Sequence, residues 1–153
     1  MKNFLLLIAL VILTPSVAQT SFTDFYKENN DNSDIAIGFS NSLVSSFLFD
    51  DDDEMKELIK KAKHTRVMVF SDNWENTNAN FNKFINRSRF DKLVKIKDDD
   101  ANINLYTQEE KNLIKEIVVQ IATDGELILL GLKTNLTHED LAKIFSSNHI
   151  TFN

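Results

Sequence analysis

The longest regular pattern in the sequence is a pair of apolar runs over residues 113–136, joined at Asp124-Gly125. An Asp-Gly dipeptide between strand-like runs is typical of a two-residue hairpin, whose type I′ turn needs positive φ at both central residues. One face of this hairpin is wholly aliphatic, which predicts that it lies on a core. The predicted register pairs Ile121 with Ile128, Val119 with Leu130, Ile117 with Leu132, and Glu116 with Lys133.

Three further stretches read as strands. Residues 34–39 alternate large and small side chains, and residues 65–71 are apolar on both faces, which is typical of a central strand. Residues 93–97 and 102–107 alternate apolar with polar positions and predict a second hairpin. Its expected register pairs Val94 with Leu105, Ile96 with Ile103, Lys95 with Asn104, and Lys97 with Asn102.

Apolar residues recur at helical spacing within residues 22–26, 43–48, 55–62, 81–85 and 137–147. Thr137 and Asp140 have the spacing of a capping box at the start of the last of these helices. The asparagine-rich residues 73–80 are expected to form a connection that carries Trp74, the only tryptophan. We expect Trp74 to cover an edge of the core, and a binding platform is the alternative. Together these elements predict an α+β fold, with a mostly antiparallel sheet of five or six strands and amphipathic helices packed on one face.

The first residues have the features of an export signal. Lys2 precedes an apolar run over residues 4–13, and Ser16-Val17-Ala18 is a small-x-small cleavage pattern. The run is shorter than the roughly 20 apolar residues of a membrane span. We therefore expect a cleavable signal peptide at residues 1–18 and a single α+β domain at residues 19–153, in the periplasm or secreted. Because the chain has no cysteine, we expect neither a lipoprotein anchor nor disulfides nor a cysteine-ligated zinc.

The charge of the chain and its lack of catalytic motifs reduce the number of possible functions. The chain has 17 basic and 23 acidic residues, for a net charge of −6, which argues against a nucleic-acid partner. The three histidines, His64, His138 and His149, lie in no recognisable catalytic motif. We therefore expect no cofactor and a protein that is not an enzyme. A hydrolase assembled from distant acids and His64 remains an alternative.

One acidic stretch resembles a calcium-binding loop. Asp98, Asp100, Asn102 and Glu109 have the spacing of EF-hand positions 1, 3, 5 and 12. Position 6, where glycine supplies the turn, is Ile103, and the flanking residues have the period of strands. The pattern favours a hairpin turn, and a calcium-responsive module that uses residues 98–109 is kept as an alternative.

The second face of the 113–136 hairpin is only half polar, because Val118, Leu127 and Leu129 lie beside charged and polar residues. A sheet face that is open to water is usually more polar than this. Either a helix or the C-terminal tail covers these three residues, or they form a docking surface for another envelope protein.

Most of the chain resembles the exported bacterial family known as domain of unknown function 4252. The resemblance is carried by EMKELIKKAKHTRVMVFSDN at residues 54–73, LVKIKDDDANINLY at 93–106, EIVVQIATDGELILLGLKTNLTHEDLAKI at 116–144, and Phe25-Tyr26-Lys27. It implies an envelope protein of Gram-negative bacteria with no assigned activity and no functional residues to carry over. Some members are implied to be encoded beside extracytoplasmic-function sigma factors. We therefore expect a non-catalytic envelope protein that acts through protein contacts, with envelope stress signalling as one such role.

Overall fold

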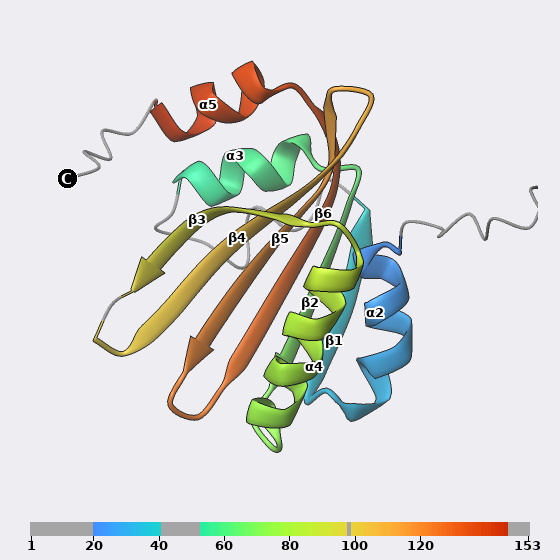
Figure 1. Cartoon of the computed structure of the whole chain (residues 1–153), viewed down its shortest axis with the longest axis vertical. Helices are drawn as coiled ribbons and strands as arrows, with labels where there is room; N and C mark the ends of the chain where they lie inside the picture. Colours follow the sequence, from blue (N-terminus) through green and yellow to red (C-terminus); the bar gives the residue numbers. More distant parts are fainter. Residues whose placement is uncertain (1–19, 41–52, 98, 147–153) are drawn as a thin grey trace, which may run out of the picture.

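The computed structural model describes residues 20–40, 53–97 and 99–146. The expected signal peptide and the expected helix at residues 43–48 lie outside these ranges. The elements are, in chain order, α2 (Phe22–Asn29), the short 3-10 helix η1 (Asn30–Asn32), β1 (Ile35–Ser40), α3 (Asp53–Lys61), β2 (His64–Phe70), α4 (Trp74–Arg87), β3 (Asp91–Lys97), β4 (Ala101–Glu110), β5 (Leu113–Thr123), β6 (Leu127–Leu136) and α5 (His138–Ser146) (Figure 1). None of the helices among these residues is long and apolar enough to cross a membrane.

The strands of the described chain form one six-stranded antiparallel sheet in the order β1-β2-β6-β5-β4-β3. The predicted α+β class is therefore confirmed. The late strand β6 lies between β2 and β5 at the centre of the sheet, which is why it is buried along most of its length. Both predicted hairpin registers are confirmed pair for pair, including Glu116 opposite Lys133 and Val94 opposite Leu105.

The turn between β5 and β6 is where the sequence predicts it but is not of the predicted type. Neither Asp124 nor Gly125 takes a positive φ. Instead the Thr123 backbone N–H donates to the Glu126 carbonyl at 2.9 Å, and the Thr123 hydroxyl accepts the Gly125 N–H at 3.5 Å. The positive φ pair lies one hairpin earlier, at Lys111 (53°) and Asn112 (62°) between β4 and β5, which is the backbone of a type I′ turn.

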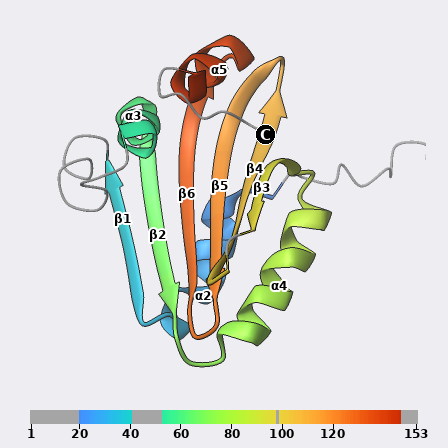
Figure 2. The ribbon, with the colours of Figure 1, turned by 90° about the vertical axis from the view of Figure 1, so that its left-hand side faces the viewer.

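The helices cover both faces of the sheet, and the expectation that they pack on one face was wrong (Figure 2). Alternate residues of a strand point to opposite faces, and β5 and β6 carry apolar residues on both. On the α3/α5 face, Ile117 and Val119 pack with residues of α3 and α5. On the α2/α4 face, Val118 packs with aromatic residues of α2 and α4.

Helix α4 starts earlier than the sequence predicts. It begins at Trp74 and takes up the asparagine-rich stretch that was expected to be a connection. Asparagine is a poor helix former, so local propensity argues against a helix here. The packing of Phe81, Phe84 and Ile85 against the sheet outweighs that propensity. Asn73, with a φ of 53°, makes the sharp entry into the helix.

Candidate functional site

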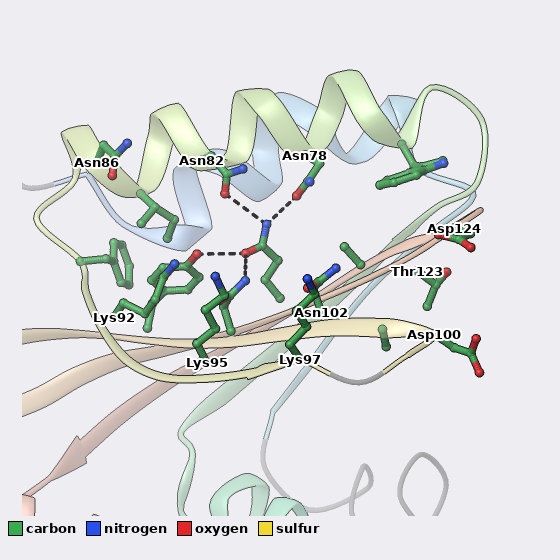
Figure 3. Close-up of a pocket in the computed structure, with 18 of the residues that line it drawn as sticks. Asn78, Asn82, Asn86, Lys92, Lys95, Lys97, Asp100, Asn102, Thr123 and Asp124 are labelled. Carbon is green, nitrogen blue, oxygen red and sulfur yellow. Dashed lines mark hydrogen bonds between the residues drawn. The ribbon is translucent and has the colours of Figure 1, made fainter.

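A polar cleft lies between α4 and the strands β3, β4 and β5 (Figure 3). Its volume is about 650 Å³. The helix lines it with residues four positions apart, so that they form one stripe of α4: Trp74, Asn78, Asn82 and Asn86. A helix that packs on a sheet normally turns apolar residues toward it. This stripe is therefore unusual, and it makes the roof of the cleft a row of amides.

The floor of the cleft centres on Gln120 of β5, whose exposed fraction is only 2%. Its side-chain amide donates to Asn78 Oδ1 at 2.5 Å and to Asn82 Oδ1 at 3.2 Å, which joins the sheet to the helix. Its carbonyl oxygen accepts the Tyr106 hydroxyl and the Asn104 amide, each at 3.0 Å. A buried amide costs little when every group is paired, so this network holds Gln120 in one orientation.

Three properties of this network bear on what the cleft can bind. Because Asn78 and Asn82 use their oxygens to accept from Gln120, their amide N–H groups are the donors left over. Asn104 is in the opposite state, since its Oδ1 is buried and accepts no hydrogen bond from the part of the chain that is described. Burial also raises the pKa of Tyr106, so that its hydroxyl keeps its proton and remains a donor.

Three lysines of the edge strand β3 line the same cleft: Lys92, Lys95 and Lys97. Strict alternation would put Lys92 and Lys95 on opposite faces. A β-bulge at Leu93 shifts the register, so that Lys92 lies opposite Tyr106 and Lys95 lies opposite Asn104. The Lys92 ammonium lies 5.5 Å from the centre of the Tyr106 ring. Among the described residues, none of the three forms an ion pair.

The cleft has two ends of opposite charge. Lys92 and Asn86 lie at one end, and Asp100 and Asp124 lie at the other, next to Thr123 (Figure 3). Both aspartates are exposed. The cleft can thus contact an anionic group at its lysine end and hydrogen-bond donors at its aspartate end.

The α3/α5 face has a second feature, an open apolar row. Helices α3 and α5 lie across the end of the sheet that is remote from the β5–β6 turn (Figures 1 and 2). Near that turn, one β-branched residue from each strand stands in register across the whole sheet. This apolar row consists of Ile35, Val69, Ile128, Ile121, Ile103 and Ile96. Its two ends are the most open, with Ile35 46% and Ile96 47% exposed.

Acidic residues surround the open end of this row. They lie just beyond the strand ends, in the turns and connections at that edge of the sheet. We call them the acidic rim: Asp34, Asp72, Asp100, Asp124 and Glu126. Asp34 accepts the backbone N–H of Ser71 at 2.6 Å, which links the start of β1 to the end of β2. The row is thus an apolar strip with a negative border.

Comparison with known proteins assigns the chain to a protein family. A family model described as Domain of unknown function (DUF4252) matches residues 26–144, which is most of the sequence. The chain belongs to the DUF4252 family. No curated protein and no solved structure matches it. The matched residues of this DUF4252 domain include the whole polar cleft and all six strands that carry the apolar row.

Of the two alternatives for Val118, Leu127 and Leu129, cover by helices is the one found in this DUF4252 domain, and the three residues form no docking surface. Val118, Leu127 and Leu129 each have an exposed fraction of 0%. They lie under α2 and α4, packed with Phe22, Phe81 and their neighbours. The hairpin pattern shows that this face is apolar, but it does not show which helices cover it. Of the four exposed large apolar residues in the described chain, Ile35, Ile37 and Ile96 are on the opposite face, and Leu93 lies at the β3 bulge.

The calcium-loop hypothesis is also wrong in its geometry. Asn102 and Glu109 both belong to the extended strand β4. Seven residues of strand separate them by roughly 23 Å, so they cannot ligate one ion. Asp98 lies outside the described residues. Glu109 Oε1 instead lies 3.0 Å from His138 Nε2, on the exposed surface.

Two other sequence candidates are placed by the structure. His64 is exposed at the start of β2, opposite Lys133. Trp74 is partly buried against the α2/α4 cluster, as expected for a residue at the edge of a core, and it also lines the cleft. The cleft itself was missed. Its signals in the sequence are the four-residue spacing of Trp74, Asn78, Asn82 and Asn86 and the lysines of residues 92–97.

Proposed function

We propose that this DUF4252 domain is an exported, non-catalytic envelope protein that binds another protein through its open apolar row. The observation that carries the proposal is the row itself, six β-branched residues in register with ends nearly half exposed. A contiguous apolar strip on the surface of a monomer is characteristic of a binding site. Covering it would remove apolar area from water at about 25 cal/mol per Å².

The acidic rim specifies the kind of partner. A second copy of the chain would bring its own rim and a net charge of −6 toward the first, and like charges at close range oppose association. A segment with an apolar face and basic flanks would cover the row and place its cations near Asp34, Asp72 and Glu126. The proposed partner is therefore a cationic amphipathic segment of another protein.

Export is the second part of the proposal. It is supported by Lys2, the apolar run over residues 4–13 and the Ser16-Val17-Ala18 pattern. Expression of the full chain in a Gram-negative host, followed by fractionation and mass measurement, tests it. We expect a periplasmic or secreted product that begins at Gln19. A product that keeps residues 1–18 and stays in the cytoplasm would refute export without touching the binding proposal. The envelope role that we propose is stress signalling, because the resemblance implies that some members are encoded beside extracytoplasmic-function sigma factors.

A labelled peptide tests the binding. The probe is a 14-residue helix-forming peptide of leucine and lysine with one apolar face, and its control replaces every lysine by glutamate. Fluorescence anisotropy should show saturable binding of the basic peptide, with weaker affinity at high salt. The acidic peptide should not bind.

A matched pair of variants locates the site. Ile35→Ser/Ile96→Ser changes the two open ends of the row, and we expect it to weaken binding by about tenfold or more. Leu93→Ser is the control, because Leu93 is 48% exposed but lies at the β3 bulge, outside the row. Melting curves establish that both variants fold. Equal affinity of both variants, or a stable homodimer in sedimentation with no peptide binding, would overturn the proposal.

A further inference from the structure

We propose that the polar cleft under α4 binds a carboxylated sugar, with the carboxylate at the lysines of β3 and the hydroxyl groups at the amides. This site is on the opposite face from the apolar row, and its lysines and amides take no part in the proposed protein contact, although Asp100 and Asp124 of the acidic rim lie at its far end. The argument rests on the donors, the acceptor and the aromatic surface that the cleft brings together (Figure 3).

The hydrogen-bond donors of the cleft favour an anionic ligand. Lys92, Lys95 and Lys97 line one wall, and the amide N–H groups of Asn78 and Asn82 lie across from them. Lysine carries three N–H donors and no acceptor, so this part of the cleft has far more donors than the protein's own acceptors satisfy. A carboxylate is matched to such a surface because charged hydrogen bonds are the stronger ones.

The acceptors call for hydroxyl groups on the same ligand. Asn104 lines the cleft, and its buried Oδ1 accepts no hydrogen bond from the described residues. Asp100 and Asp124 at the far end are acceptors as well. A simple inorganic anion cannot serve these groups, whereas a sugar acid carries several hydroxyl donors beside its carboxylate.

The asparagine stripe of α4 also supports a ligand in the cleft. Asn78, Asn82 and Asn86 occupy helix positions where alanine or leucine would favour the helix more. Their stripe faces the cleft, and Gln120 is buried to hold two of them. Trp74 adds an aromatic surface at the same stripe, on which the C–H face of a sugar ring can lie. Stability alone does not account for this arrangement.

Trp74 supplies its own readout, since it is the only tryptophan of the chain. Sodium glucuronate, glucose and inorganic phosphate are titrated into the full domain, with tryptophan emission and calorimetry recorded in parallel. We expect glucuronate to give a saturable change in both signals. Glucose lacks the charge and phosphate lacks the hydroxyl pattern, so each should bind at least about tenfold more weakly than glucuronate.

Two sets of variants complete the test. Lys95→Gln/Lys97→Gln changes two exposed residues and should lower the glucuronate affinity by about tenfold or more. Lys83→Gln is the control, since Lys83 is exposed on α4 but does not line the cleft. Ile35→Ser/Ile96→Ser should bind glucuronate as the unmodified protein does, which separates this site from the apolar row. The inference is overturned if neither signal responds to glucuronate, if phosphate binds as tightly, or if Lys95→Gln/Lys97→Gln retains full affinity.

Discussion

Phe81 on the α2/α4 face and Ile35 on the α3/α5 face mark the difference between the two sides of this sheet. Phe81 is fully buried and meets the ring of Phe25 edge to face, with centroids 5.4 Å apart and an angle of 79°. Ile35 belongs to an aliphatic surface and is 46% exposed. Aromatic side chains from two helices close the first face around a polar cleft. The second face is closed only where α3 and α5 lie, and its far end stays open.

This difference has a simple origin in the alternation of the strands. Neighbouring residues of β5, such as Val118 and Val119, serve different layers of the molecule. Each layer can therefore change its chemistry without altering the other. The polar cleft and the open apolar row are binding features of two different kinds, built on the same six strands.

Truncation of the buried ring should show the largest contrast between the faces. Phe81→Ala removes the centre of the aromatic cluster, and we expect it to lower the free energy of unfolding by about 3–5 kcal/mol. Ile35→Ala should cost less than about 1 kcal/mol because the side chain is already partly in water. Urea denaturation measures both. Equal losses would mean that the two faces are not packed differently.

Two glycines test how closely α2 approaches the sheet. A Cβ at Gly131 of β6 would overlap the ring of Phe22, so Gly131→Ala should cost about 1–3 kcal/mol by overpacking. Gly38→Ala is the matched change in β1, where the new Cβ would meet Arg66 Cγ at an ordinary 3.8 Å. It should be neutral or stabilising by up to about 0.5–1 kcal/mol. A harmless Gly131→Ala would show that α2 does not pack where it is placed.

The two tyrosines test the polar network of the cleft. Tyr106→Phe removes the hydroxyl that donates to the Gln120 carbonyl oxygen, and we expect a loss of about 1 kcal/mol in the free energy of unfolding. Tyr26→Phe is the control, because the Tyr26 hydroxyl forms no hydrogen bond with the described residues. Its ring lies 5.5 Å from the Arg66 guanidinium, a contact that phenylalanine keeps. Equal stability of the two variants would mean that the Tyr106 hydrogen bond does not stabilise the fold.

The smallest effect concerns Glu116 of β5, whose carboxylate accepts a backbone N–H at the start of α2. Burial raises the pKa of this carboxyl above its ordinary value of 4.5, although the Phe22 N–H donates to it at 2.8 Å and Lys133 lies opposite. The folded protein therefore holds the proton more tightly than the unfolded chain does. The contribution of Glu116 to stability should fall as pH rises from about 4.5 through the raised pKa, and return on acidification.

Glu116→Gln cannot titrate and keeps an oxygen for the Phe22 N–H. Relative to the unmodified protein, this variant should gain stability between pH 4.5 and pH 8, as measured by urea denaturation across that range. A difference that does not vary with pH would mean that burial does not perturb this carboxyl.

The pairing of the strands could largely be predicted from local sequence patterns. A two-residue period fixes which residues share a face, so the pairs of Ile121 with Ile128 and Val94 with Leu105 follow from the sequence once the turns are located. The capping box of α5 also follows, with the Asp140 N–H donating to Thr137 Oγ1 at 3.1 Å. These features depend on neighbours along the chain or across one turn.

Features that depend on contacts between distant segments could not be predicted from local sequence patterns. An apolar stripe on residues 22–29 shows that this helix packs on something, but not that Phe22 packs beside Gly131 on the face opposite to α3. The cleft joins Asn78, Lys95, Asn104 and Gln120 from four elements, and no short motif spans them. The bulge at Leu93 was missed as well, although the two consecutive apolar residues Leu93 and Val94 break the alternation of β3.

That bulge puts two lysines with an odd spacing on the same face of β3. If the same residues formed a regular strand, Lys92 and Lys95 would point to opposite faces of the sheet. A one-codon deletion at Leu93 would place Lys92 two positions from Lys95, so regular alternation would then keep both lysines on the cleft side. Related domains can therefore lose the bulge residue in evolution without losing a cation from the cleft.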